Sequence, residues 1–123
     1  MVAAPRDYRS TGGEMVSAGA VDLVGRMVSM SKTHRTFALT GAICTAVAAA
    51  LPGTVVHDVV AAHDPAVLRI GHPAGVLEVG TRLRAVGDGW EIESVTTYRT
   101  ARRIMEGYVR VPAHVLGRAP SLV

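Results

Sequence analysis

The stretch from Thr40 to Leu51 constrains the fold more than any other part of this chain, because it has the composition of a helix and almost no polar face. It reads TGAICTAVAAAL and is followed by Pro52-Gly53, a pair that ends helices. We expect Thr40 to cap the first turn. A helix that is apolar all round must be surrounded by lipid or by protein. A bilayer requires about 20 apolar residues, so we expect a sheet to wrap around this helix.

The rest of the sequence indicates two shorter helices and several strands. Residues 1–19, which contain Ser10-Thr11-Gly12-Gly13 and Gly19, are expected to form a loop or a frayed segment. Helical spacing predicts a helix over 20–28, β-propensity a strand over 34–39, and a capping Thr54 a helix over 55–60. Strands are expected at 67–70, 76–86, 90–96 and 108–111, with a hairpin turn at 87–89, and the run up to Met105 fits either strand or helix.

This order of elements predicts an α+β fold in which a mixed or antiparallel sheet wraps around a central buried helix. The length suits one domain, which we expect over residues 20–112, followed by a tail over 113–123. A single cysteine, Cys44, excludes an intramolecular disulfide and fits a reducing compartment. With no apolar leader or spanning segment in the sequence, we expect a cytoplasmic protein without a membrane partner.

The net charge of +3 comes mainly from arginines that are dispersed along the chain. Nucleic-acid-binding proteins usually show a denser basic stripe with interleaved aromatics, so we expect no nucleic-acid partner. A basic surface of this kind can instead attract a small polyanionic substrate. The histidines fall in no metal-ligand spacing, and no phosphate-binding or catalytic-triad motif is present.

Three stretches, in order, resemble one protein family. The first is RMVSMSKTH at 26–34 with TGAIC at 40–44 and PGT at 52–54; the second is GHPAG at 71–75; the third is YRTARRIMEG at 98–107 followed by Val111-Pro112. The family is that of the PrpF-type isomerases, which includes 2-methylaconitate cis-trans isomerase, 3-methylitaconate isomerase and 4-oxalomesaconate tautomerase. The resemblance extends from about Pro5 to Pro112.

The resemblance implies a diaminopimelate-epimerase-like fold, with two lobes that each enclose a central helix and an active site between them. It implies an isomerase that moves a proton between carbons of an unsaturated di- or tricarboxylate without a metal or an organic cofactor. This chain would be the C-terminal lobe, and the family's acid-base lysine and cysteine would lie in the missing N-terminal part. The partners expected are therefore a carboxylate substrate and a missing N-terminal lobe or a second copy.

Thr40, Gly41 and Ala42 are candidate substrate-binding residues, because amides at a helix N-terminus bind anions. The alternative is that Gly41 and Ala42 are small only because the sheet crowds them. Cys44 lies about one turn further along, and we interpret it as a core residue more readily than as a nucleophile. In related epimerases the catalytic cysteine comes just before the Thr-Gly-Ala turn, where this chain has Ala38 and Leu39.

Two further groups are candidates for substrate binding. His72, Ala74 and Gly75 join two strands; Ala74 stands where the family has a serine, so backbone amides would make the contact, and a plain tight turn is the alternative. Ser31, Lys32 and His34 offer a cation and a titratable ring, with a solvated loop as the alternative. Arg99, Arg102 and Arg103 fit a solvated face better than a carboxylate clamp.

The leading hypothesis is therefore the C-terminal portion of a cofactor-independent isomerase that contributes carboxylate-binding groups. No catalytic residue can be named, because no acid-base pair is identifiable in the sequence. The alternative hypothesis is a non-catalytic binding or interaction domain that retains the fold.

Overall fold

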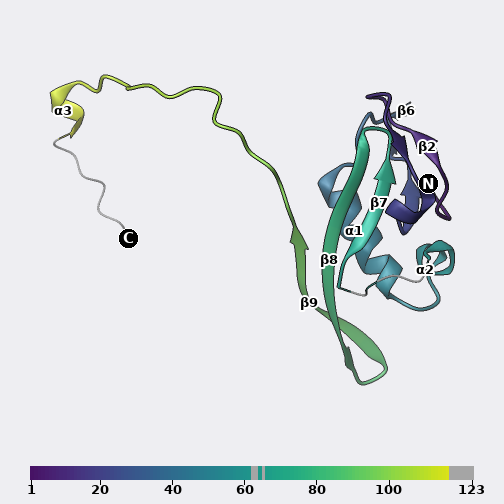
Figure 1. Ribbon diagram of the computed structural model, residues 1–123. Helices are drawn as coiled ribbons and strands as arrows, with labels where there is room; N and C mark the ends of the chain where they lie inside the picture. Colours follow the sequence, from purple (N-terminus) through teal and green to yellow (C-terminus); the bar gives the residue numbers. More distant parts are fainter. Residues whose placement is uncertain (62–63, 65, 117–123) are drawn as a thin grey trace.

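A computed structural model describes residues 1–61, 64 and 66–116 of the chain. Most of them form a body built on one mixed sheet, from which the C-terminal residues extend away (Figure 1). The sheet has the strand order β1-β4-β7-β8-β9. Its strands are β1 (Val2–Ala3), β4 (Leu23–Gly25), β7 (Leu68–His72), β8 (Gly75–Val86) and β9 (Gly89–Thr97).

One pair of strands in this sheet is parallel, and this pair sets the position of the helices. Leu23 of β4 lies beside Ile70 of β7 in parallel register, while the other neighbours are antiparallel. Parallel neighbours need a long crossover connection. Helices α1 (Leu39–Ala50) and α2 (Val55–Val59) supply it. The mixed sheet that the sequence predicts is confirmed, and α1 packs against β7 and β8.

Helix α1 forms where its sequence predicts, but it is not buried all round. Ala42, Ala46 and Ala49 face the core and are buried, together with Leu68 and Ile70 of β7. Thr40 and Cys44 lie on the opposite face and are exposed. The expected envelopment of the helix by sheet is therefore not confirmed: the main sheet contacts α1 through β7 and β8, and α2 also packs against it. The prediction that Cys44 is a core residue is wrong.

The helix caps also differ from the expectation for one of the two helices. Ala38 is the N-cap of α1 and makes no side-chain capping bond, so Thr40 lies inside the first turn. Thr54 caps α2 as predicted: its hydroxyl oxygen accepts the His57 amide N–H at 3.1 Å and donates to the carbonyl of Ala48. That second bond joins the start of α2 to the last turn of α1.

Residues 1–19 are more ordered than the sequence predicts. Strand β1 pairs with β4 and forms one edge of the main sheet, with Val2 packed against the core. Strands β2 (Tyr8–Arg9) and β3 (Met15–Val16) form an antiparallel pair, followed by the 3-10 turn η1 (Ala18–Ala20). The expectation of a loop fails because these strands are two residues long, too short to show periodicity.

The predicted helix over 20–28 is wrong. The segment contains β4, whose residues are all buried, and it leads into β5 (Val28–Ser29), which pairs with β6 (Lys32–Thr33). A strand buried on both faces has no polar alternation, so periodicity does not distinguish it from a short buried helix. The strand predicted over 34–39 is absent as well: Phe37 is buried beside the core and α1 begins two residues later.

The hairpin of β8 and β9 forms as predicted, with Gly87 in its turn at φ 57°. Beyond it, residues 98–112 contain neither helix nor strand, so the strand expected at 108–111 is not formed. We refer to residues 98–112 as the C-terminal arm (Figure 1). The short helix α3 (Ala113–Leu116) follows it. The remainder of the expected tail, residues 117–123, lies outside the described residues.

Candidate carboxylate-binding site

The amino end of α1 opens into a cavity of about 440 Å³. It is bounded by the start of α1 and by the hairpin of β5 and β6, which precedes α1 in the chain. Its lining residues are Met27, Ser29, His34, Ala38, Thr40, Gly41 and Cys44. Three of the residues predicted to bind substrate, His34, Thr40 and Gly41, are therefore brought together here.

The first amides of α1 are oriented as an anion site requires. The N–H of Ala42 donates to the carbonyl of Ala38 at 2.9 Å, which is the first hydrogen bond of the helix. The amides of Thr40 and Gly41 precede it and have no carbonyl one turn earlier in the helix. They carry the positive end of the helix dipole. Ala42, by contrast, has its amide engaged and its side chain fully buried in the core, so it does not line the cavity.

Gly41 has a packing role beside its proposed binding role. A Cβ atom at this position would lie 1.9 Å from Cε of Met27. The absence of a side chain therefore makes room for Met27, which comes from the preceding β4–β5 connection and not from the main sheet. The alternative reading of Gly41 as a crowded position thus has a structural basis, although the crowding atom is the end of a flexible side chain.

His34 is fixed by the hairpin that precedes α1. Its amide N–H donates to the carbonyl of Met27 at 2.9 Å, which extends the pairing of β5 and β6. The turn between these strands is formed by Met30 and Ser31, which have φ values of 48° and 61°. Ser31 and Lys32 are exposed on this hairpin and do not line the cavity, so the structure places them beside the site and not in it.

His72, Ala74 and Gly75 form a separate cluster at the turn between β7 and β8. The Ala74 amide donates to Nδ1 of His72 at 3.2 Å, and the Gly75 carbonyl accepts the Tyr8 hydroxyl at 2.6 Å. The guanidinium of Arg26 lies 5.4 Å from the centre of the Tyr8 ring. These bonds favour the interpretation of residues 72–75 as a tight turn over a role in substrate binding, because the Ala74 amide already has an acceptor.

The cluster shifts the pKa values of two of its side chains. Burial, and then the charge of Arg26, lower the pKa of His72 below its ordinary value of 6.5. Burial raises the pKa of Tyr8 above its ordinary value of 10.0, against smaller lowering effects of a main-chain hydrogen bond and then of the charge of Arg26. His72 is therefore held neutral near pH 7. Sequence reasoning missed Tyr8 and Arg26, because Tyr8 meets its partners across the fold.

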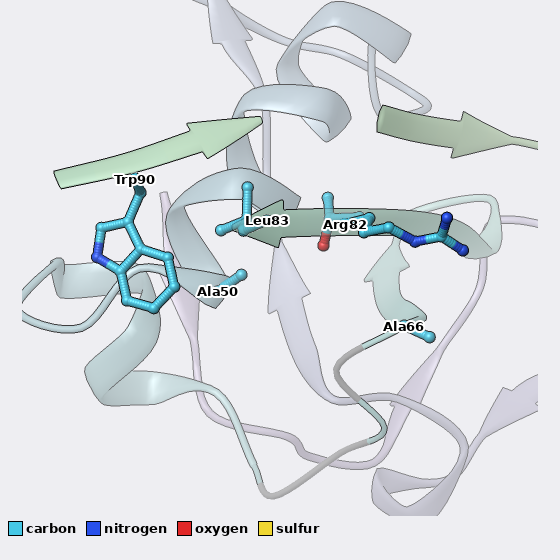
Figure 2. Close-up of a pocket in the computed structure, with 6 residues that line it drawn as sticks. Ala50, Ala66, Arg82, Leu83 and Trp90 are labelled. Atoms are coloured by element: carbon cyan, nitrogen blue, oxygen red, sulfur yellow. The ribbon is translucent and has the colours of Figure 1, made fainter. Parts of the chain in front are cut away.

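A second hollow, of about 420 Å³, lies between the end of α1, Ala66 and the hairpin of β8 and β9. Figure 2 shows Trp90 at the end near Ala50 and Leu83, with the Arg82 side chain extending away from it. None of the residues predicted to bind substrate lines this hollow. Its lining combines the apolar side chains of Ala50, Leu83 and Trp90 with Thr81 and Arg82.

Comparison with known proteins identifies the family to which this chain belongs. The chain resembles a solved structure of methylitaconate-delta-isomerase with a TM-score of 0.72 and 45% identity, over 89% of this chain and 28% of that one. The model of the family described as PrpF protein matches residues 1–112. The chain belongs to the PrpF family, as its sequence motifs indicate.

The curated relatives are named as isomerases. The chain is 46% identical over 112 residues to 3-methylitaconate isomerase of Eubacterium barkeri, which covers 89% of this chain and 28% of that protein. It is 40% identical over 111 residues to 2-methyl-aconitate isomerase of Shewanella oneidensis, covering 90% of this chain and 28% of the relative. The chain thus spans little more than a quarter of the length of these relatives. Within the described residues, no helix has the length and apolar character to cross a bilayer.

Proposed function

We propose that this chain is one part of a cofactor-independent isomerase that shifts a proton within an unsaturated di- or tricarboxylate such as 2-methylaconitate. Its part in that reaction is to hold a carboxylate at the amino end of α1. The observation that carries the proposal is the cavity in which Thr40 and Gly41 meet His34. Membership of a family whose relatives are named as isomerases of methylated dicarboxylates and tricarboxylates supports the substrate class.

The chemistry of the cavity fits an anion. Two amides at the positive end of α1 donate hydrogen bonds, and the ring of His34 offers a further donor. Lys32 on the neighbouring hairpin is exposed, and none of the described residues that line the cavity is a carboxylate. A carboxylate bound to two main-chain amides makes charge-assisted hydrogen bonds, which are about twice as strong as neutral ones.

Proton transfer requires groups that the proposed site does not supply. The acid-base lysine and cysteine of the family are proposed to lie in the region that this chain does not span, which corresponds to an N-terminal lobe. On this view the present chain is the C-terminal lobe and binds substrate without turning it over. The turn between β7 and β8 is proposed to make a second contact with the substrate, through the main chain of Gly75. His72, which is held neutral in this turn, is not proposed as the base.

Cys44 provides a direct test because its thiol lines the proposed site and is exposed. We expect iodoacetamide to alkylate Cys44 in the folded chain, and cis-aconitate to slow the reaction at constant ionic strength. The variant His34→Ala should weaken this protection, whereas His114→Ala, which removes an exposed histidine in α3, should not. Equal protection by sodium chloride, or none by cis-aconitate, would argue against carboxylate binding at α1.

The catalytic half of the proposal needs a separate measurement. Incubation of the chain alone with 2-methylaconitate in D₂O should give no deuterium incorporation, because the acid-base pair is absent. Incorporation by the purified chain would contradict the assignment of this chain as a binding lobe. The alternative of a non-catalytic binding domain has no observation in its favour beyond that same absence, and the isomerase relatives favour the first proposal.

A further inference from the structure

The cavity at the amino end of α1 has an apolar part that a carboxylate group does not use. Beside the amides of Thr40 and Gly41, its lining contains the apolar or weakly polar side chains of Met27, Ala38 and Cys44. The side chains of methionine and alanine offer a carboxylate oxygen no hydrogen-bond donor. This part of the lining therefore suits the carbon atoms of a bound acid and not its charged oxygens.

The side chain of Met27 lies against the main chain of Gly41. A Cβ atom on Gly41 would be 1.9 Å from Cε of Met27 and 3.5 Å from its sulfur. The terminal methyl group of Met27 therefore occupies the space that a side chain at position 41 would fill. This close approach places an apolar group directly beside the first turn of α1.

Met27 is anchored on one side and open to the cavity on the other. Its carbonyl accepts the His34 N–H at 2.9 Å, which fixes its main chain at the start of the β5–β6 hairpin. Its side chain packs against the hydrophobic core but is only half-buried, because it also lines the cavity. A methionine side chain is unbranched and polarizable, so it adapts to the shape of an apolar neighbour.

Cys44 borders the same space from within α1. Residues three and four positions apart are neighbours on the surface of a helix, so Cys44 lies next to both Gly41 and Thr40. Thr40 and Cys44 are exposed, and both line the cavity. An acid whose carboxylate lies on the amides of Thr40 and Gly41 therefore has its adjoining carbon atoms close to Met27 and Cys44.

We propose that Met27 is a specificity-determining residue of this site, and that its terminal methyl group contacts an alkyl substituent next to the bound carboxylate. The inference rests on the proposed function, because it requires a carboxylate at the amino end of α1. Burial of one methyl group favours binding about fourfold, so this contact distinguishes acids that differ only by a methyl. A methionine that merely fills space beside the core would affect the stability of the fold and not the choice between two such acids.

A pair of acids that differ by one methyl group tests this role. The acids cis-aconitate and 2-methyl-cis-aconitate carry the same carboxylates, and for each we would measure the concentration that halves the rate of Cys44 alkylation by iodoacetamide. We expect the methylated acid to protect at an about fourfold lower concentration. In Met27→Gln, which keeps the length of the side chain but makes its end polar, the ratio should fall to about one. Met27→Leu keeps an apolar side chain of similar volume and should retain most of the preference.

Further variants separate this role from an effect on folding. Met27→Ala removes the side chain beyond Cβ and should lower the ratio as Met27→Gln does, and circular dichroism checks that both variants are folded. Met105→Gln makes the same change at an exposed position of the C-terminal arm and should leave the ratio unchanged. Equal protection of the parent chain by the two acids would overturn the role of Met27 and leave the carboxylate site intact, and so would a preference that persists in both folded variants. Protection by neither acid would overturn the proposed function itself, and the role of Met27 with it.

Discussion

Asp22 and Arg69 are joined through both main chain and side chain. The Asp22 carboxylate accepts the Arg69 amide N–H at 2.7 Å and its Nη2 at 2.6 Å, and the Asp22 amide donates to the Arg69 carbonyl at 2.8 Å. Asp22 is 1% exposed. The hydrogen bonds with Asp22 raise the pKa of Arg69 further above its already high value. These bonds fix the segment before β4 to the parallel strand β7.

Removal of the Asp22 carboxylate is expected to destabilise the body. In Asp22→Ala the main-chain N–H of Arg69 loses its acceptor, and an unsatisfied amide of this kind costs about 1–3 kcal/mol. Urea unfolding followed by circular dichroism measures the change in the free energy of unfolding. Glu14→Ala removes an exposed carboxylate and is the control. Equal stability of the two variants would show that the pair does not hold β4 to β7.

Thr54 is expected to stabilise the junction of the two helices. Its hydroxyl caps α2 at the His57 amide and also donates to the Ala48 carbonyl in α1. Loss of a threonine cap costs about 0.5–2 kcal/mol. Thr54→Ser, which keeps the hydroxyl, should retain most of the stability that Thr54→Ala loses. Thr100→Ala, at an exposed position in the arm, should have no effect on the thermal midpoint.

The stability of the fold is expected to depend on pH through His72. The pKa of His72 in the folded state is lower than its ordinary value of 6.5. At pH values between the folded and the ordinary pKa, the unfolded chain therefore binds more protons than the folded chain. The free energy of unfolding therefore rises with pH through this window. The contribution of His72 is fully present above pH 6.5 and is lost as the pH falls through the folded pKa.

Urea unfolding at a series of pH values measures this dependence. The variant His72→Gln keeps a hydrogen-bond acceptor for the Ala74 amide but does not titrate, so its curve should be flatter below pH 6.5 than that of the parent chain. His114→Gln replaces an exposed histidine and should leave the slope as it is. A slope that persists in His72→Gln would assign the effect to another group.

The elements that the sequence predicts well are those specified locally. α1 is predicted by its alanines and by Pro52-Gly53, and the β8–β9 hairpin by alternation around Gly87. Strand β4 is missed because burial on both faces removes the alternation that identifies a strand. These differences show that periodicity is informative only where one face of an element meets solvent.

The site shows the same limit. The amino end of α1 and His34 are near each other in the chain, so local reasoning is enough to bring them together. Tyr8 and Gly75 are 67 positions apart, and nothing in the sequence indicates their hydrogen bond. The apolar surroundings of Cys44 in the sequence predict that it is buried. Which stripe of the helix is covered depends, however, on where the main sheet lies, and the sheet packs against the face of α1 that points away from Cys44.

The turn of the β5–β6 hairpin is a position where the sequence opposes the backbone. Met30 and Ser31 have positive φ, which costs an ordinary residue about 1–2 kcal/mol. Two-residue hairpin turns with positive φ at both positions prefer Asn-Gly. The double variant Met30→Asn with Ser31→Gly is therefore expected to raise the free energy of unfolding by about 1 kcal/mol. If substrate contacts depended on the Ser31 hydroxyl, this variant would also lose the protection of Cys44 by cis-aconitate; we expect the protection to remain, because Ser31 does not line the cavity.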